Sequence, residues 1–227
     1  KDAIIPGLYA YEAGQAAVGD LFNYSASLAP KSYVDQAEKQ GLSILEYLEK
    51  LAADISIDKQ HVTVLDWHNG NRSILSDSKL TGSIFGLTLQ TPFEMIHKAY
   101  LESTAFGTKM IMQQFENNHI PVETVYAAGG IPIKSELLVD IYANVLNKEV
   151  VVIDSSNATA LGAAMLGANV GGAYPTLKET VKHMKQPVYY RKQPEAKKVK
   201  QYALLFDRYK ALHDLLGKEY PQLSYIN

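Results

Sequence analysis

Cysteine is absent from the 227 residues of this chain. Disulfide frameworks, cysteine-ligated zinc sites and thiol nucleophiles are therefore excluded. The absence suits a reducing compartment, and we expect a cytoplasmic protein. The six histidines are scattered, and no two of them have the spacing of metal ligands. The sequence thus predicts no metal site formed by this chain alone.

Long apolar runs are also missing, since none approaches the ~20 residues needed to span a bilayer. No signal-peptide pattern opens the chain. It begins at Lys1 without an initiator methionine, and we expect it to be part of a longer protein. The net charge of −2 argues against nucleic-acid and membrane-surface binding, which both require an excess of Lys and Arg. We interpret the basic cluster Lys197, Lys198 and Lys200 as a solvated helix face.

The hydrophobic content of 47% is sufficient for a normal core. Apolar strand patterns alternate with amphipathic helix patterns, which predicts an α/β fold in one domain. The clearest helix start is at Thr91-Pro92, where Thr91 is predicted to cap and Pro92 to occupy the first helical position. The predicted strands are 62–65, 84–89, 124–127 and 150–153. The predicted helices are 12–28, 42–53, from 91–92 to 117, 135–147, 158–168 and 195–216, with a break at 30–33.

The pair Gly129-Gly130 lies between a predicted strand and a predicted helix. Glycine lets a ligand approach the backbone, and a helix N-terminus offers free amides to phosphate. A tight strand-to-helix turn without a ligand is the commoner meaning of such a pair taken alone. A Walker loop is excluded because Ala128 and Ile133 stand where glycines are required, and no G-x-G-x-x-G is present.

A second turn precedes the small-residue helix that starts at Ala158, and Ser156 or Asn157 is predicted to cap it. We interpret the small residues of that helix as a means of close packing on a sheet. Asp66 and Glu102 are the carboxylates that acid–base chemistry would use. Neither has a His or carboxylate partner nearby in the sequence, so we favour a structural role for both. No G-x-S-x-G nucleophile turn occurs.

Three blocks of sequence together resemble the C-terminal domain of the FGGY carbohydrate kinases, within the branch that phosphorylates L-ribulose. The first block is 5–20, the second is 65–73 followed by 81–88, and the third is 129–132 with 160–164. The resemblance covers nearly the whole chain. The sequence across 82–102 matches a signature of this family only in part. Met95 stands where a polar residue is usual, and Tyr100 stands where a smaller residue is common.

The resemblance implies an actin-like, ribonuclease-H-like ATPase domain with a mixed sheet flanked by helices. It implies that 1–227 form the C-terminal nucleotide-binding domain of a two-domain kinase, whose N-terminal sugar-binding domain is absent from this chain. The catalytic base and the Mg²⁺-positioning carboxylate belong to that other domain, so no catalytic residue is expected here.

The resemblance also implies the residues that contact ligands. Those expected to bind ATP are Gly129, Gly130, Ile131, Lys134, Ser135, Gly86, Thr88 and Gln15, the last near the hinge. Those expected in a loop that faces the sugar domain are Asp66, Trp67, Asn69 and Arg72.

The expected activity of the parent protein is transfer of the ATP γ-phosphoryl group to L-ribulose, giving L-ribulose 5-phosphate, with Mg²⁺. The expected partners are ATP or ADP, L-ribulose and the N-terminal domain, and a homodimer is allowed. The isolated chain is expected to be inactive. Two alternatives stay open: a kinase for another sugar or polyol such as xylulose or glycerol, and a non-catalytic actin-like scaffold.

Overall fold

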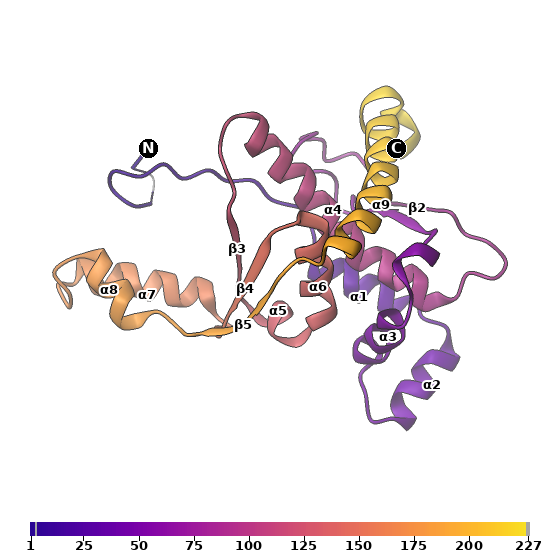
Figure 1. Cartoon of the computed structure of the whole chain (residues 1–227), viewed down its shortest axis with the longest axis horizontal. Coiled ribbons are helices and arrows are strands. Elements are labelled where there is room, and N and C mark those ends of the chain that lie inside the picture. The colour runs from indigo at the N-terminus through magenta and orange to yellow at the C-terminus, as the bar shows by residue number, and fades with distance from the viewer. Residues whose placement is uncertain (3, 226–227) are drawn as a thin grey trace. The chain divides into compact units, whose positions relative to one another are not determined.

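The computed structural model describes residues 1–2 and 4–225 and divides into two compact units (Figure 1). Unit 1 contains 1–121 and 200–227, and unit 2 contains 122–199. Within the described residues, no helix is long and apolar enough to cross a membrane.

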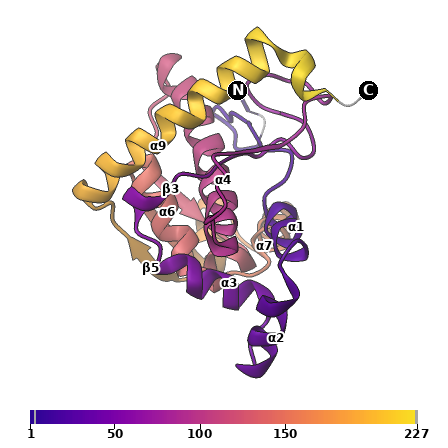
Figure 2. The same ribbon diagram turned by 90° about the vertical axis from the view of Figure 1, so that its right-hand side faces the viewer.

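Unit 1 is built around the long helix α4 (Phe93–Asn117), whose residues are largely buried. The helices α1 (Gly19–Ser27) and α3 (Ile44–Ala53) and the strand β1 (Thr63–Leu65) pack on it, as Figure 2 shows for the two helices. β1 pairs antiparallel with β2 (Ser83–Phe85). The remaining elements are α2 (Lys31–Lys39), η1 (Ile57–Lys59), the major part of α9 (Ala196–Asp214), η2 (Leu215–Glu219) and η3 (Pro221–Ser224).

The contact between α4 and α9 within unit 1 is aromatic. The ring of Phe106 lies 5.4–6.4 Å, centroid to centroid, from those of Tyr202, Phe206 and Tyr209. Tyr202 and Tyr209 are almost completely buried. Aromatic side chains bury more apolar area than any others, so this cluster is a principal source of stability in unit 1.

Several sequence-based boundaries in unit 1 are wrong, and the strand predicted over 84–89 already ends at Phe85. Residues 12–18 are not helical, because their polar groups bond to partners elsewhere: the Gly14 amide donates to Ser73 Oγ at 2.8 Å. The predicted break at 30–33 contains the start of α2, with Pro30 at its N-cap position. Thr91 does not cap α4, because its hydroxyl accepts from the Thr88 amide at 2.9 Å and Pro92 takes the N-cap position.

Unit 2 contains a three-stranded mixed sheet in the order β3 (Thr124–Ala127), β4 (Glu149–Ile153), β5 (Val188–Lys192). β3 runs parallel to β4, and β5 runs antiparallel to it. A core cluster of Val139, Ala143, Val150 and Val152 joins α6 (Glu136–Leu146) to the central strand. The predicted α/β character and mixed sheet are therefore confirmed.

Several predictions for unit 2 need correction. β5 and α8 (Leu177–Met184) were not predicted, and the expected loop after Gly129-Gly130 contains the short helix α5 (Gly130–Lys134). α7 (Ala158–Val170) buries none of its residues, so its small side chains do not serve close packing on the sheet. Neither Ser156 nor Asn157 caps α7 through a side-chain hydrogen bond. Asn157 Nδ2 instead lies 3.5 Å from Ser156 Oγ.

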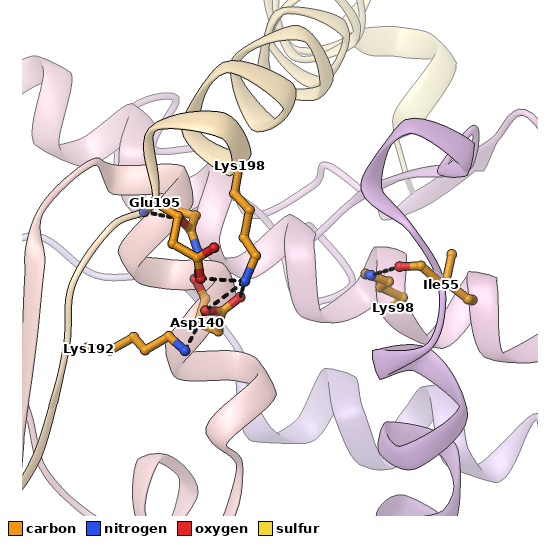
Figure 3. A network of polar contacts seen from close by, with 7 residues as sticks. Ile55, Lys98, Asp140, Lys192, Glu195 and Lys198 are labelled. Atoms are coloured by element: carbon orange, nitrogen blue, oxygen red, sulfur yellow. Dashed lines mark hydrogen bonds and ion pairs between the residues drawn. The ribbon is translucent and has the colours of Figure 1, made fainter.

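An ion-pair network joins α6, β5 and the start of α9 in unit 2 (Figure 3). Asp140 accepts from Lys192 at 2.8 Å and from Lys198 at 3.1 Å, and Lys198 also pairs with Glu195 at 2.7 Å. Burial alone would raise the pKa of Asp140, but the two ammonium groups lower it overall. Lys197 and Lys200 are exposed, as expected of a solvated helix face, while Lys198 is partly buried and uses its charge in these ion pairs. Figure 3 also shows Lys98 donating to the carbonyl of Ile55 in unit 1.

Candidate functional site

The glycine turn of unit 2 connects β3 to α5 in a conformation that requires glycine. Gly129 has φ +104°, which L side chains rarely adopt. Its amide donates to the Ser155 carbonyl at 2.8 Å, which ties the turn to the end of β4. A Cβ on Gly129 or Gly130 would meet no atom within 4 Å. The backbone here is therefore open to a ligand, with the first amides of α5 beside it.

The other three predicted ATP residues of unit 2 follow this turn. Ile131 and Lys134 are exposed on α5. Ser135 is buried, and its Oγ accepts from the Leu138 amide at 3.1 Å as the N-cap of α6. Ser135 thus fixes the start of α6, while Lys134 offers a mobile positive charge to a ligand at the turn.

Gly86 and Thr88 lie in unit 1, in the loop that follows β2. Gly86 has φ +86°, and a Cβ there would stand 2.2 Å from the carbonyl oxygen of His61. Glycine at this position is therefore required by the packing of the loop. Thr88 is held in a turn before α4, where its Oγ1 lies 3.1 Å from the Thr91 hydroxyl. The predicted ATP set is thus divided between the two units.

Gln15, the remaining predicted ATP residue, is bound inside unit 1. Its Nε2 donates to Asp66 Oδ2 at 2.8 Å and to the Thr104 carbonyl at 2.9 Å, and its Oε1 accepts from the Thr108 hydroxyl at 3.0 Å. Gly107 makes room for this amide, because a Cβ there would come within 2.4 Å of Gln15 Nε2. The side chain of Gln15 consequently anchors the extended N-terminal segment to α4.

Asp66 lies at the end of β1 with both carboxylate oxygens bonded. Tyr209 donates to Oδ1 at 2.6 Å, and Gln15 donates to Oδ2 at 2.8 Å. Burial raises the pKa of Asp66, and these two hydrogen bonds oppose that rise. The cavity beside Asp66 has a volume of about 10 Å³, which is room for one water at most. The structural role favoured for Asp66 from the sequence agrees with this geometry.

Glu102 is likewise a buried structural carboxylate. Gln60 Nε2 donates to its Oε2 at 3.0 Å, and burial raises the pKa of Glu102 to about 7. Lys98 and the hydrogen bonds from Gln60 and Tyr202 act in the opposite direction. Glu102 is 1% exposed, so a substrate does not reach it.

The predicted sugar-facing loop presents only part of its residues to solvent. Trp67 is 1% exposed, with its ring 5.2 Å from that of His213, while Asn69 and Arg72 are exposed. Arg72 forms an ion pair with Glu12 at 2.5 Å. Sequence reasoning missed this pair, whose two members are 60 residues apart. It also missed Gly107, although a lone glycine inside a long helix pattern is a signal of close packing.

In residues 1–2 and 4–225, no group of three or more His, Cys, Asp or Glu side chains could hold a metal ion. The described residues therefore do not themselves form a cage for Mg²⁺, which proteins commonly bind through one or two carboxylates together with substrate phosphates.

Comparison with known families and proteins gives a consistent picture. Residues 1–170 match the C-terminal domain of the FGGY family of carbohydrate kinases. The chain is 71% identical over 226 residues to a ribulokinase of Staphylococcus epidermidis, covering 100% of this chain and 42% of that protein. It is 57% identical over 217 residues to a ribulokinase of Staphylococcus aureus, covering 96% and 40% respectively. The chain thus spans less than half the length of these curated relatives.

Solved structures show the same fold at low sequence identity. A ligand-bound xylulose kinase from Lactobacillus acidophilus aligns with a TM-score of 0.74 at 21% identity, over 91% of this chain and 39% of that one. A gluconate kinase from Lactobacillus acidophilus aligns with a TM-score of 0.73 at 22% identity, with the same coverage. The predicted actin-like, ribonuclease-H-like fold is confirmed.

Proposed function

Because the chain belongs to the FGGY family of carbohydrate kinases, we propose that it is the nucleotide-binding, C-terminal half of a two-domain, cytoplasmic kinase. In this proposal both units belong to that half, and an N-terminal domain completes the enzyme. The reaction is transfer of the γ-phosphoryl group of ATP to L-ribulose, giving L-ribulose 5-phosphate and ADP. The identities of 71% and 57% to proteins named ribulokinase support L-ribulose as the acceptor.

The observation that carries the nucleotide assignment is the open glycine turn at Gly129-Gly130. Its backbone faces space that no side chain fills, and the first turn of α5 has amides without intrahelical partners. Backbone amides at such a turn suit the oxygens of a phosphate, and Lys134 adds positive charge on the same short helix. ATP therefore fits the chemistry of this turn.

The contribution of this half to catalysis is positioning. Phosphoryl transfer depends on holding the γ-phosphoryl group in line with the acceptor hydroxyl and on balancing the charge that develops. The turn restrains the phosphate chain, while Ser135 keeps α6 in place behind it through its cap. The base that accepts the hydroxyl proton belongs to the N-terminal domain in this proposal. Mg²⁺, bound mainly there and by the phosphates, supplies charge neutralisation.

The alternative acceptors are weaker candidates. Xylulose and gluconate kinases share the fold at 21–22% identity, which carries no information on the sugar. A non-catalytic scaffold would not need an open glycine turn. A panel of L-ribulose, D-xylulose and glycerol assayed with the product of the full reading frame discriminates among the acceptors.

The test is calorimetric titration with ATP, with and without Mg²⁺, of the protein encoded by the full reading frame and of its Gly130→Asp variant. We expect ATP affinity to fall at least about tenfold in the variant, because a carboxylate at the turn repels phosphate. Gly167→Asp is the matched control, since a Cβ there also meets nothing within 4 Å and neither glycine has a positive φ. Unchanged ATP affinity in Gly130→Asp, or no ATP binding by the wild type, would overturn the proposal.

A further inference from the structure

The C-terminal segment of unit 1 contacts a loop that lies far from it in the sequence. This segment, residues 215–225, contains η2, η3 and Tyr225, and it lies outside the residues 1–170 that match the carbohydrate kinase family. The loop, residues 70–81, lies between β1 and β2. The C-terminal segment has no part in the proposed nucleotide site.

Three residues of the loop contact the end of the C-terminal segment. The carbonyl of Ser224 accepts from the Thr81 amide at 2.7 Å and from the Thr81 hydroxyl at 2.8 Å. The phenol of Tyr225 donates to Asp77 Oδ2 at 2.9 Å, and Lys79 Nζ lies 6.0 Å from the centre of the Tyr225 ring. Ser224 is 3% exposed, so water does not compete freely for these bonds.

The start of the C-terminal segment packs on the middle of the same loop. A Cβ on Gly217 would stand 2.4 Å from Leu75 Cδ1 and 3.1 Å from Trp67 Cη2. Gly217 does not have a positive φ, so the close approach requires glycine here and the backbone conformation does not. The segment therefore touches the loop at two places, through packing at Leu75 and through hydrogen bonds from Asp77 onwards.

The backbone of the loop is strained between its anchored ends. Ile74 has φ +100° and Ser76 has φ +53°, in the left-handed region that favours glycine. A β-branched residue in this region is a genuine outlier, and it persists only where the surrounding structure holds it. On its α4 side the loop borders a groove of about 350 Å³. The restraints come instead from the two 2.9 Å backbone hydrogen bonds between Asn71 and Asp77 and from the C-terminal segment.

The strained loop in turn holds the extended N-terminal segment. Ser73 Oγ accepts from the Gly14 amide at 2.8 Å. The guanidinium of Arg72 pairs with Glu12 at 2.5 Å, and a Cβ on Gly14 would stand 3.4 Å from Arg72 Nη1. The position of residues 12–14 thus depends on the conformation of the loop.

We propose that the C-terminal segment is a positioning element for the kinase reaction and that it acts through the loop on residues 12–14. The inference rests on the proposed function, in which the polypeptide before residue 12 leads towards the N-terminal domain and its catalytic base. Holding Glu12 and Gly14 in place orients the two halves of the enzyme when the acceptor hydroxyl meets the γ-phosphoryl group. Phosphoryl transfer depends steeply on that alignment.

Hydrogen exchange at the Gly14 amide shows whether the effect crosses the loop, because the acceptor of this amide is Ser73 Oγ. All variants are made in the product of the full reading frame. We expect exchange at Gly14 to be roughly three- to tenfold faster in Tyr225→Ala, the effect of losing one hydrogen bond on the far side of the loop. Gly217→Val, which adds bulk to the contact with the loop, should accelerate it further.

Two further variants make the comparison specific. Leu223→Ala is the matched control, since Leu223 belongs to the same segment and is 72% exposed, and Gly14 exchange should stay within about twofold of the wild type. Tyr225→Phe keeps the ring beside Lys79 and loses only the hydroxyl. Its exchange rate at Gly14 should therefore fall between those of the wild type and Tyr225→Ala.

Kinetics separate positioning from a purely structural role. In Tyr225→Ala we expect kcat for L-ribulose phosphorylation to fall roughly three- to tenfold, because the reacting groups are less well aligned. ATP affinity should stay within about twofold of the wild type, since the glycine turn belongs to unit 2. Leu223→Ala should leave both quantities unchanged. A structural role alone would lower the melting temperature and leave kcat unchanged where the variant is folded.

The outcomes keep this inference and the proposed function apart. A wild type that binds no ATP contradicts the proposed function, while Gly14 exchange still decides whether the C-terminal segment acts on residues 12–14. Gly14 exchange that is equal in Tyr225→Ala, Leu223→Ala and the wild type overturns the inference even if the protein is a kinase. Faster exchange with an unchanged kcat overturns the positioning role. Should Gly217→Val fail to fold, the variants of Tyr225 still decide.

Discussion

The phenol of Tyr209 donates a 2.6 Å hydrogen bond to Asp66 Oδ1 across 143 residues of sequence. Both side chains are buried, and the bond joins α9 to the end of β1 within unit 1. Burial and the adjacent carboxylate raise the pKa of Tyr209 well above its usual value, so the phenol stays a donor. The chain segment after 200 is thereby fixed to the loop that precedes Arg72.

Tyr209→Phe should destabilise the protein by about 1–3 kcal/mol, because Asp66 Oδ1 would be left buried without this donor. Denaturant unfolding of the variant and the wild type measures the difference. Tyr189→Phe is the control, since Tyr189 is 56% exposed, and it should change stability by less than about 0.5 kcal/mol. Equal stabilities of Tyr209→Phe and the control would contradict a structural role for the bond.

Gly86→Ala should destabilise by more than a left-handed conformation alone explains. The backbone term is about 1–2 kcal/mol, and the new Cβ would also stand 2.2 Å from the His61 carbonyl oxygen. Gly41→Ala isolates the backbone term, because Gly41 has φ +66° and nothing within 4 Å of a Cβ. Thermal unfolding of the two variants gives both values. A smaller loss in Gly86→Ala than in Gly41→Ala would show that the close approach to His61 is not real.

Glu102 should make the protein less stable as pH rises. Burial raises the folded-state pKa of Glu102 to about 7, above the unfolded value of about 4.3, so the folded state binds the extra proton in this interval. The contribution of Glu102 to stability is therefore full below about pH 4.3 and is lost as pH rises to about 7, by about 4 kcal/mol in all. Glu102→Gln should flatten this slope. Denaturant unfolding of the wild type and the variant between pH 4 and 8 measures this slope, with Glu123→Gln at an exposed position as the control. A slope in Glu102→Gln equal to that of the wild type would contradict the raised pKa of Glu102.

Asp140 should show the opposite dependence. Its pKa is lowered overall in the folded state by Lys192 and Lys198, so its stabilisation is present above the unfolded value of about 3.9 and is lost as pH falls further. At neutral pH, Asp140→Asn should cost about 1 kcal/mol, the scale of a partly exposed ion pair. The difference from the wild type should shrink in acid. Denaturant unfolding at pH 3 and pH 7 checks this, with Asp154→Asn, exposed and away from the network, as the reference.

The parts of the fold that could be predicted from the sequence depend on local signals. β4 is a run of buried β-branched residues, and α6 begins at the Ser135 cap and continues with one apolar face, so both were found nearly to the residue. The extended segment 12–18 was mistaken for helix because its partners are distant: Gln15 bonds to Asp66, 51 residues away. β5 was missed because its side chains are largely exposed and give no apolar strand pattern. Its strand conformation comes from the antiparallel pairing with β4.

The features of the candidate site also differ in whether a local sequence signal reveals them. The glycine turn could be found from the sequence because its signal is local: Gly129 adopts a positive φ, which favours glycine, within the turn itself. The groove between 72–74 and 111–115 has no signal in the sequence, because the residues that line it are far apart along the chain. The positive φ of Ile74, in the loop that forms one side, is not indicated by any residue propensity. The burial of Trp67 and Asp66, as opposed to Asn69 and Arg72, also depends on α9, which follows more than a hundred residues later.

The lack of a Cβ at Gly107 has an evolutionary consequence. A Cβ there would come within 2.4 Å of Gln15 Nε2 and 2.8 Å of Asp66 Oδ2. Positions 15, 66 and 107 therefore cannot change independently, since any larger residue at 107 displaces an amide that three other groups hold. Homologous chains should vary at these positions as a linked set, and a lineage that acquires alanine at 107 should first have shortened the residue at 15.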